Sequence, residues 1–334
     1  MTMGFIEANA ALIMVAVIAL AVVIYVVVDG FDLGIGMLFL VAPRESDRDT
    51  MMASIDPVWD GNETWLVFGG VLLLAAFPAA YYVLLPAAYL PVVFMLFGLI
   101  LRGISFGFRA ETSRFRGVWD TVFALGSLLT ALCQGLILGN LVAGVPIENG
   151  MYAGGPFGFL TLAGVASAIG VASGYMLLGA SWLVLKTTGS TQVFGREVGR
   201  AALILVTVMM IVVSALTSLA DPEVAARWFS FPNIAYLALV PVLTALVVAA
   251  LWRSFWGPHD GRPFQLSVGL FLLGTLGLVV SLWPYVVPRH ITIWNGASDS
   301  QTLAFAAVGA LIFVPLVLAY QIHAYWVFRG KVGE

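Results

Sequence analysis

Four acidic residues lie inside stretches of the sequence that are otherwise apolar. Asp29 and Asp32 come near the end of the first apolar stretch, in the motif VDGFDLGIGML. Asp60 and Glu63 come near the start of the second, in SIDPVWDGNETWLVFGG. A spacing of three residues puts the members of each pair on the same face of a helix. A carboxyl group at the depth of a bilayer core costs roughly 2.5–3.5 kcal/mol, so these groups must face protein or water.

The second motif carries a further acid one turn earlier. Asp56, Asp60 and Glu63 follow i, i+4, i+7 spacing and predict one acidic stripe along a helix, with Pro57 suited to its first turn. Acids in a first turn also complement the helix dipole, which is a purely structural explanation of Asp56. That explanation does not extend to Glu63, which is expected about two turns into the helix.

We expect the two acidic pairs to face one another, because the first helix ends and the second begins on the same side of the membrane. Crowded carboxyl groups with little water around them repel, which leaves a group able to take up and release a proton near neutral pH. A proton path requires such a group. The alternative is that the acids only lock two helices together, bonded to backbone groups or to the neighbouring Trp59, Asn62 and Trp65.

The residues that bind haem iron or zinc are sparse and scattered. His259 and His290 fall in predicted loops on opposite sides, and His323 falls near the inner end of the last predicted helix. None has another His, Cys or carboxylate at metal-ligand spacing, and Cys133 is the only cysteine. The sequence therefore predicts that this chain alone binds no haem and no metal.

The composition indicates that these residues lie on membrane-spanning helices. Of 334 residues, 61% are hydrophobic and 10% are charged, and the mean hydropathy is +1.01. This predicts an all-α integral membrane protein. The formal charge of -3 argues against nucleic acid as a partner. The first apolar run lacks a basic flank and is too long for a signal peptide, so we expect it to be retained as a membrane span.

Nine apolar segments of membrane-spanning length can be marked off by charges, prolines and glycine clusters. We expect a single polytopic membrane domain over residues 1–334, with two four-helix bundles plus one peripheral helix. Small residues such as Gly164, Ala168 and Gly179 suit close helix packing. The predicted spans are 9–40, 56–78, 80–101, 118–140, 157–185, 199–219, 234–252, 265–287 and 303–328.

The basic residues predict the orientation of these spans. With nine crossings, thirteen of the fifteen Lys and Arg residues fall on one side, and only Arg227 and Arg289 fall on the other. The side rich in basic residues is expected to be cytoplasmic, so the N-terminus is outside and the C-terminus is cytoplasmic. The cytoplasmic set is Arg44, Arg48, Arg102, Arg109, Arg114, Arg116, Lys186, Arg196, Arg200, Arg253, Arg262, Arg329 and Lys331.

The two acidic motifs and several others resemble subunit II of the cytochrome bd-type quinol oxidases. The pairing of DGFDLGIG with WDGNETW at this distance is specific, and the resemblance runs nearly end to end. The segment LGASWLVLKTTG is similar to the cyanide-insensitive branch of the family. Further matching segments are LRGISFGFR, LILGNLVAGVPI, WNGASDSQTL and FVPLVLAYQIHAYWVFRGK.

The resemblance implies a heterodimer in a bacterial cytoplasmic (inner) membrane. Its subunit I would bind two haems b and one haem d, oxidise quinol near the outer face and reduce O2 to water. Subunit II would bind no haem and would stabilise subunit I. A small third subunit, and a structural quinone or lipid against this chain, remain open. The acid of the WDGN motif, here Asp60, would lie in a cytoplasmic proton path.

The resemblance also suggests roles for the motif residues. Asp60 would accept protons at the mouth of the path, Asp29 and Asp32 would be structural or relay carboxyls, and Glu63 would be a secondary site. Trp59 and Asn62 would be orienting neighbours. The family usually has an acid at position 107, where this chain has Gly107, so that role cannot be transferred.

Two further expectations concern the basic residues and a rival function. Arg102 and Arg109 match the family. By default we expect both side chains to reach the inner lipid headgroups; the alternative for Arg102 is an ion pair with the acidic residues. The rival function is a secondary transporter or channel that binds a cation at its intramembrane acids. It would require helices broken near the midplane in both halves of the chain.

Overall fold

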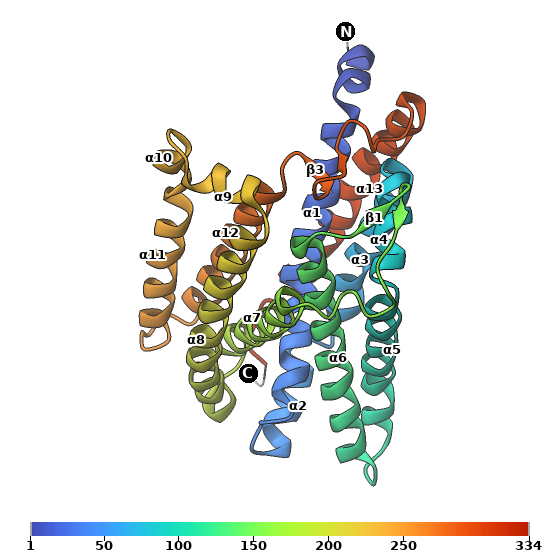
Figure 1. Cartoon of the computed structure of the whole chain (residues 1–334). Helices are drawn as coiled ribbons and strands as arrows, with labels where there is room; N and C mark the ends of the chain where they lie inside the picture. The colour runs from blue at the N-terminus through green and yellow to red at the C-terminus, as the bar shows by residue number, and fades with distance from the viewer. Residues whose placement is uncertain (1, 333–334) are drawn as a thin grey trace.

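The computed structural model describes residues 2–332, with side chains described from Asn9 onward. In that part the chain forms thirteen helices and two short antiparallel hairpins, β1 (Ile147–Glu148) with β2 (Met151–Tyr152) and β3 (Tyr285–Val287) with β4 (Ile291–Thr292) (Figure 1). The helices are α1 (Thr2–Leu38), α2 (Glu45–Ala53), α3 (Trp59–Ala76), α4 (Pro78–Ala87), α5 (Tyr89–Glu111), α6 (Arg116–Ala143), α7 (Leu162–Lys186), α8 (Gly189–Ala220), α9 (Pro222–Phe229), α10 (Asn233–Leu237), α11 (Leu239–Ser254), α12 (Gly261–Leu282) and α13 (Ser300–Val327).

The membrane-spanning elements confirm the predicted all-helical architecture. Within the described residues, eight helical segments are long and apolar enough to cross a bilayer, with α10 and α11 counted as one. The 18-residue helix α3 is the ninth candidate, and its polar first turns lower its hydropathy. Helices α1, α3, α5 and α6 form one group, α7, α8, α11 and α12 form a second, and α13 packs on α1 and α3.

Close backbone contacts join the two groups. A Cβ added at Gly34 of α1 would collide with the carbonyl of Tyr175 in α7, and one at Gly179 would collide with the backbone at Gly34. Gly135 and Gly139 of α6 lie in the same way against Ala168 and Gly164 of α7. The small residues predicted to serve helix packing therefore do so, and they bring α7 against both α1 and α6.

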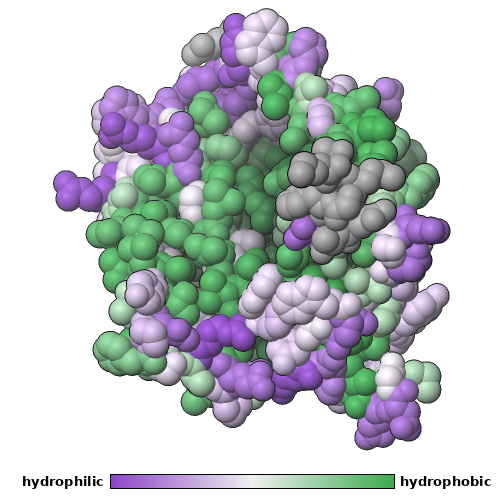
Figure 2. Space-filling model, turned by 90° about the horizontal axis from the view of Figure 1, so that it is seen from above, coloured by the Kyte–Doolittle hydropathy of each residue, from purple (hydrophilic) through white to green (hydrophobic). Residues whose placement is uncertain are grey.

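The loops gather at two ends of the molecule. At the hairpin end lie the N-terminal part of α1, both hairpins, α4 and α9 (Figure 1). At the opposite end, which we call the α2 end, the loops contact one another: Lys331 donates to Asp260 at 2.6 Å, and Ser190 donates to Asp47 at 2.7 Å. Seen from above, apolar side chains form broad areas and hydrophilic ones gather toward the edge (Figure 2).

Several predicted boundaries differ from the structure. The predicted span 80–101 joins α4 to the first half of α5, whereas the helix that crosses is α5 and it continues to Glu111. Pro78 starts α4, and the chain reorients at Ala88 before α5 begins. The predicted span 265–287 ends too late, because α12 ends at Leu282 and residues 285–287 pair as a strand. Between the two acidic motifs the chain forms the short helix α2, which no predicted span includes.

Candidate functional site

The buried side chain of Arg102 is the centre of the acidic site. Arg102 lies within α5 with no exposed surface. Its Nη1 lies 2.6 Å from Asp29 Oδ1 and 3.1 Å from Glu63 Oε1, and its Nη2 lies 3.7 Å from Asp32 Oδ2. Helices α1, α3 and α5 therefore each contribute to one group of charges, which we call the central cluster: Arg102, Asp29, Asp32 and Glu63.

This position corrects the default expectation for Arg102. The sequence places it at the end of a predicted span, from which it would reach the inner headgroups. In the structure nine more helical residues follow it, so Arg102 lies about 14 Å from the end of α5. Arg109 does not reach outward either, because its Nε lies 2.5 Å from Asp120 and its Nη2 lies 2.8 Å from Asp49.

Asn62 and Trp59, which the sequence proposes as orienting neighbours, both lie beside the central cluster. The buried Asn62 donates from Nδ2 to Asp32 Oδ2 at 2.7 Å and to the Val28 carbonyl at 3.2 Å. The Trp59 ring stacks on Phe106 with centroids 4.5 Å apart, and the Arg102 guanidinium lies 5.9 Å from it. The cluster is therefore held by a buried amide on one side and closed by aromatic rings on another.

Asp60 does not join the central cluster, which corrects the expectation that both acidic pairs face each other. Asp60 is exposed, and the described residues give its carboxylate no hydrogen bond or ion pair. It is close enough to Glu63 for the two carboxylates to interact electrostatically. A helix turns about 100° per residue, so when Asn62 faces α1, Asp60 points about 200° away from it.

The acidic stripe is also shorter than expected. Asp56 precedes the helix, because residues 54–58 form a turn and α3 starts at Trp59. Pro57 disfavours the helical conformation at the residue before it, which accounts for the later start. Asp56 is exposed, and only Asp60 and Glu63 of the stripe lie on α3.

Sequence reasoning missed two sets of polar partners. On α13, the Tyr325 hydroxyl donates to Asn62 Oδ1 at 2.9 Å, and Gln321 accepts from Trp65 Nε1 at 2.7 Å. In the molecular interior, Tyr25, Gln134 and Tyr175 form a second hydrogen-bonded set. These partners could have been found from polar residues at helical spacing inside apolar spans. Gln321 and Tyr325 are four residues apart and so share a face of α13, and Tyr25 is four residues before Asp29 on α1.

Several charged atoms of the central cluster lack hydrogen-bond partners among the described residues. They are Asp29 Oδ2, Asp32 Oδ1, Glu63 Oε1, and Nε and Nη2 of Arg102. Glu63 Oε1 is at ion-pair distance from Arg102 but lacks hydrogen-bond geometry. Three carboxyl groups share one guanidinium, and buried charge without a partner costs several kcal/mol. The arrangement therefore suits a site that holds one or more protons together with ordered water.

The donor set of the chain does not suit a buried haem. His259, His290 and His323 are all exposed. Among the described residues, no group of three or more His, Cys, Asp or Glu side chains is arranged to hold a metal ion. Gly107, where the family usually has an acid, is exposed and a Cβ there would meet open space.

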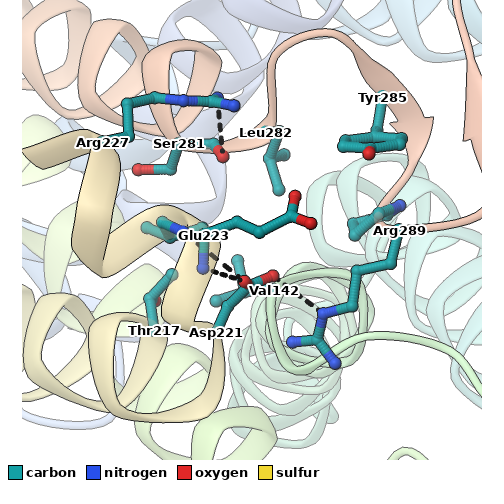
Figure 3. A pocket seen from close by; sticks show the side chains of 11 residues that line it. Val142, Thr217, Asp221, Glu223, Arg227, Ser281, Leu282, Tyr285 and Arg289 are labelled. Carbon is teal, nitrogen blue, oxygen red and sulfur yellow. Dashed lines mark hydrogen bonds and ion pairs between the residues drawn. The ribbon is translucent and has the colours of Figure 1, made fainter.

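A small cavity lies at the hairpin end, lined by none of the residues of the central cluster (Figure 3). There Arg289 Nε lies 2.7 Å from Asp221 Oδ2, and Arg227 donates to the carbonyl groups of Val280 and Trp283 at the end of α12. The cavity measures about 20 Å³, which is room for one water molecule and not for an organic ligand. Its polar residues therefore serve to join α9 to the end of α12.

Comparisons with known proteins bear on this arrangement. The family model described as cytochrome bd terminal oxidase subunit II matches residues 10–328. The chain is 30% identical to the probable cytochrome oxidase subunit 2 of Haemophilus influenzae, covering 92% of this chain and 90% of that one. It is 28% identical to cytochrome bd ubiquinol oxidase subunit 2 of Bacillus subtilis, covering 92% of each chain.

Two further similarities agree with these. The chain is 27% identical to cytochrome bd-I ubiquinol oxidase subunit 2 of Escherichia coli, covering 93% of this chain and 92% of that one. Its fold is similar to a chain in the structure of bd oxidase from Geobacillus thermodenitrificans, with a TM-score of 0.74 and 18% identity over 95% of this chain and 98% of that one.

Proposed function

The chain belongs to the cytochrome bd terminal oxidase subunit II family, and we propose that it acts as the haem-free subunit of a quinol:O2 oxidoreductase in a bacterial cytoplasmic membrane. In this role it stabilises a haem-bearing subunit I and carries protons from the cytoplasmic side. The two haems b and the haem d of subunit I supply the electron transfer and the reduction of O2. Quinol is the substrate of the complex.

The excess of carboxyl groups over cations in the central cluster is the observation that supports proton transfer. Asp29 and Asp32 are fully buried, and Glu63 has 27% of its side chain exposed. One guanidinium balances one of these three carboxylates, so taking up protons removes buried charge. A site of this kind exchanges protons with its surroundings more readily than a balanced ion pair does.

The route that we propose starts at Asp60 and leads inward through Glu63 to Asp32. Asp60 is exposed at the first turn of α3, Glu63 lies one turn deeper, and Glu63 shares the Arg102 guanidinium with Asp32. The exposure of each carboxyl group falls in that order. The end at which the route starts is the one richer in basic residues, and the positive-inside rule assigns that end to the cytoplasm.

The exposed side of α3, α5 and α13 supports an obligate partner. A lone carboxylate such as Asp60 is costly against lipid. The side chains of Val67, Phe97 and Tyr320 on these helices are more than half exposed in the isolated chain and suit lipid as well as protein, so the charge at Asp60 is what favours a protein partner on this side. We assign this side to subunit I.

The rival function as a cation transporter has no support in the helices that carry the acids. Helices α1 and α5 continue unbroken past the central cluster. Of α7, α8, α11 and α12, only α8 carries an acid among the described residues, the exposed Glu197 in the first third of the helix, and it has no paired carboxylate beside it on that helix. Broken helices paired between two halves would be expected of such a transporter.

The first experiment identifies the partner and tests the role of Asp60. The tagged chain is purified from its native membrane, and we expect a large haem-carrying protein to accompany it. Asp60→Asn is expected to lower quinol-driven O2 consumption about tenfold, which corresponds to a barrier higher by about 1.4 kcal/mol, while the haem spectrum is unchanged. The matched control is Asp56→Asn, since Asp56 is exposed in the turn before α3 and has no side-chain partner.

Two results would contradict these proposals. Recovery of the chain without any haem protein would remove the assignment as an oxidase subunit. Full turnover of Asp60→Asn at neutral and alkaline pH would remove the proton path and leave the acids as a lock between helices.

A further inference from the structure

Two buried tyrosines and a partly buried glutamine lie beside the central cluster in the molecular interior. Gln134 Nε2 of α6 donates to the Tyr25 hydroxyl of α1 at 2.7 Å. The Tyr175 hydroxyl of α7 donates to Gln134 Oε1 at 2.6 Å. Tyr25 and Tyr175 are 4% and 1% exposed, so water cannot replace these bonds without entering the core. We call this set the interior chain: Tyr175, Gln134 and Tyr25.

The interior chain ends one helical turn from Asp29. Tyr25 lies four residues before Asp29 on the same face of α1, close enough for the two groups to interact electrostatically. The Tyr25 oxygen already accepts from Gln134, so its own proton is available for an acceptor. Asp29 Oδ2 has no other hydrogen-bond donor among the described residues. A hydroxyl with a free proton therefore faces a carboxylate oxygen that needs a donor.

All the donors in this chain point the same way. Tyr175 donates to Gln134, Gln134 donates to Tyr25, and Tyr25 is left to donate to Asp29. Arg102 donates to the other oxygen of the same carboxylate at 2.6 Å. Asp29 therefore accepts from the Arg102 guanidinium through Oδ1, while its Oδ2 has no hydrogen-bond donor among the described residues. A side-chain amide in the middle of the chain does not pass protons on as a carboxyl group does, so the interior chain is not a branch of the proton path.

We propose that the interior chain positions Asp29 as the fixed counter-charge of Arg102, and that the exchangeable proton of the central cluster is carried by Asp32. This inference rests on the proposed proton path and assigns different roles to two acids three residues apart. Asp32 differs from Asp29 in its donors: the Arg102 guanidinium donates to Asp29 at 2.6 Å but lies 3.7 Å from Asp32, whose Oδ2 accepts from the neutral amide of Asn62. The Asp32 carboxylate is therefore held less strongly by the cation, and its Oδ1, which has no hydrogen-bond partner among the described residues, is where a proton can bind.

The titratable and charged groups that face Asp29 and Asp32 come from five helices. Glu63 of α3 and Arg102 of α5 lie within ion-pair distance of the cluster. The remaining hydroxyl groups are Tyr25 on α1, Tyr175 on α7 and Tyr325 on α13. Tyr325 donates to Asn62 and so supports the Asp32 side, whereas Tyr25 supports the Asp29 side.

The test uses the purified complex with its haems and two readouts. The first is the infrared difference spectrum between oxidised and reduced enzyme, in the carbonyl-stretch region of protonated carboxyl groups. The second is the pH profile of quinol-driven turnover. We expect wild type to show a protonated carboxyl band that is lost in Asp32→Asn and retained in Asp29→Asn.

The positioning role is tested by removing single hydroxyl groups. Tyr25→Phe is expected to add a second protonated carboxyl band, which disappears in the double variant with Asp29→Asn, and to shift the pH profile. Tyr175→Phe, one bond further away, should act in the same direction with a smaller shift. Tyr236→Phe is the control, because Tyr236 is 74% exposed on α10 and should leave both readouts unchanged.

Some outcomes would contradict the roles assigned to Asp29 and Asp32 and leave the proposed proton path unaffected. Loss of the wild-type band in Asp29→Asn instead of Asp32→Asn would reverse the two roles. An unchanged spectrum and pH profile in both Tyr25→Phe and Tyr175→Phe would reduce the interior chain to helix packing. By contrast, full turnover of Asp60→Asn at neutral and alkaline pH would refute the proposed path itself.

Discussion

Helix α5 carries two buried arginines, and their surroundings differ in charge balance. Arg102 is the one cation among three carboxyl groups of the central cluster. Arg109, seven residues later on the same face, belongs to a set of three cations and three acids at the α2 end. We call that set the α2 network: Arg48, Arg109, Arg116, Glu45, Asp49 and Asp120.

The difference separates a site that can exchange protons from one that holds helices together. In the α2 network each acid lies within ion-pair distance of a cation, and several members are exposed to water. Its negative and positive charges are therefore equal in number. In the central cluster the acids outnumber the cation and are mostly buried, so its charge depends on protons taken up. The same residue types on the same helix thus serve two purposes, and the ratio of acids to cations distinguishes them.

The strongest test of this comparison removes the cation of the central cluster. Arg102→Met leaves three carboxyl groups without a positive charge, and breaking such a buried group costs about 3–5 kcal/mol. That is comparable with the total stability of many domains. We expect the amount of haem-carrying complex in the membrane to fall severely, as measured by the optical spectrum per milligram of membrane protein.

A second substitution in the same protein separates charge from lost packing. Adding Asp29→Asn to Arg102→Met removes one of the stranded charges and should restore part of the complex. If Arg102→Met accumulates and turns over like wild type, Arg102 is not the counter-charge of the cluster, and the comparison between the two arginines fails.

The equivalent change in the α2 network should have a smaller and different effect. Arg109→Met removes bonds to Asp120 and Asp49, but Asp120 keeps Arg48 at 2.9 Å and Asp49 keeps Arg116 at 3.4 Å. We expect a loss of about 1–3 kcal/mol, the cost of leaving one buried polar group poorly satisfied. The midpoint of thermal unfolding should fall while turnover per haem is retained. A loss of turnover with unchanged stability would give the α2 network a role in catalysis.

The sequence predicted the helices and the buried acids well, for physical reasons. Apolar segments of bilayer length and an uneven distribution of Lys and Arg depend only on local composition, and they predicted the spans without knowledge of packing. The burial of Asp29 and Asp32 followed from the cost of placing carboxyl groups in an apolar run. The positions of α2 and α4 were missed, because short helices within loops have no bilayer-length signal.

The composition of the site could not be read in the same way. Asp60 was expected inside the cluster, but its direction depends on which face of α3 packs on α1: with Asn62 facing α1, Asp60 points about 200° away. Gln134 and Tyr25 are 109 residues apart, and Tyr325 and Asn62 are 263 apart. Such contacts arise from how helices are arranged in three dimensions, and no local pattern in either helix indicates its partner.

The smallest effect is expected at a balanced pair outside the membrane spans. Asp221, which caps α9 at the hairpin end, pairs with Arg289. Burial alone would raise the pKa of the Asp221 carboxyl, but the hydrogen bonds from Arg289 and from the backbone N–H groups of Glu223 and Val224 outweigh it, so the pKa is lowered. The pair therefore stabilises the fold above the ordinary carboxyl pKa of about 3.9, and this stability is lost as the pH falls through the lower value in the folded protein.

Asp221→Asn keeps an oxygen for the helix cap and removes the charge. Because Arg289 is 39% exposed, we expect a loss of about 0–1 kcal/mol at neutral pH. The difference between wild type and variant in thermal unfolding should shrink as the pH is lowered below about 4. A difference that stays constant across this range would mean that the cap, and not the ion pair, accounts for the effect. In that case the balanced pair of Asp221 and Arg289 would contribute no measurable stability. The comparison with the central cluster, where three acids share one cation, would then depend on Arg102 and its acids alone.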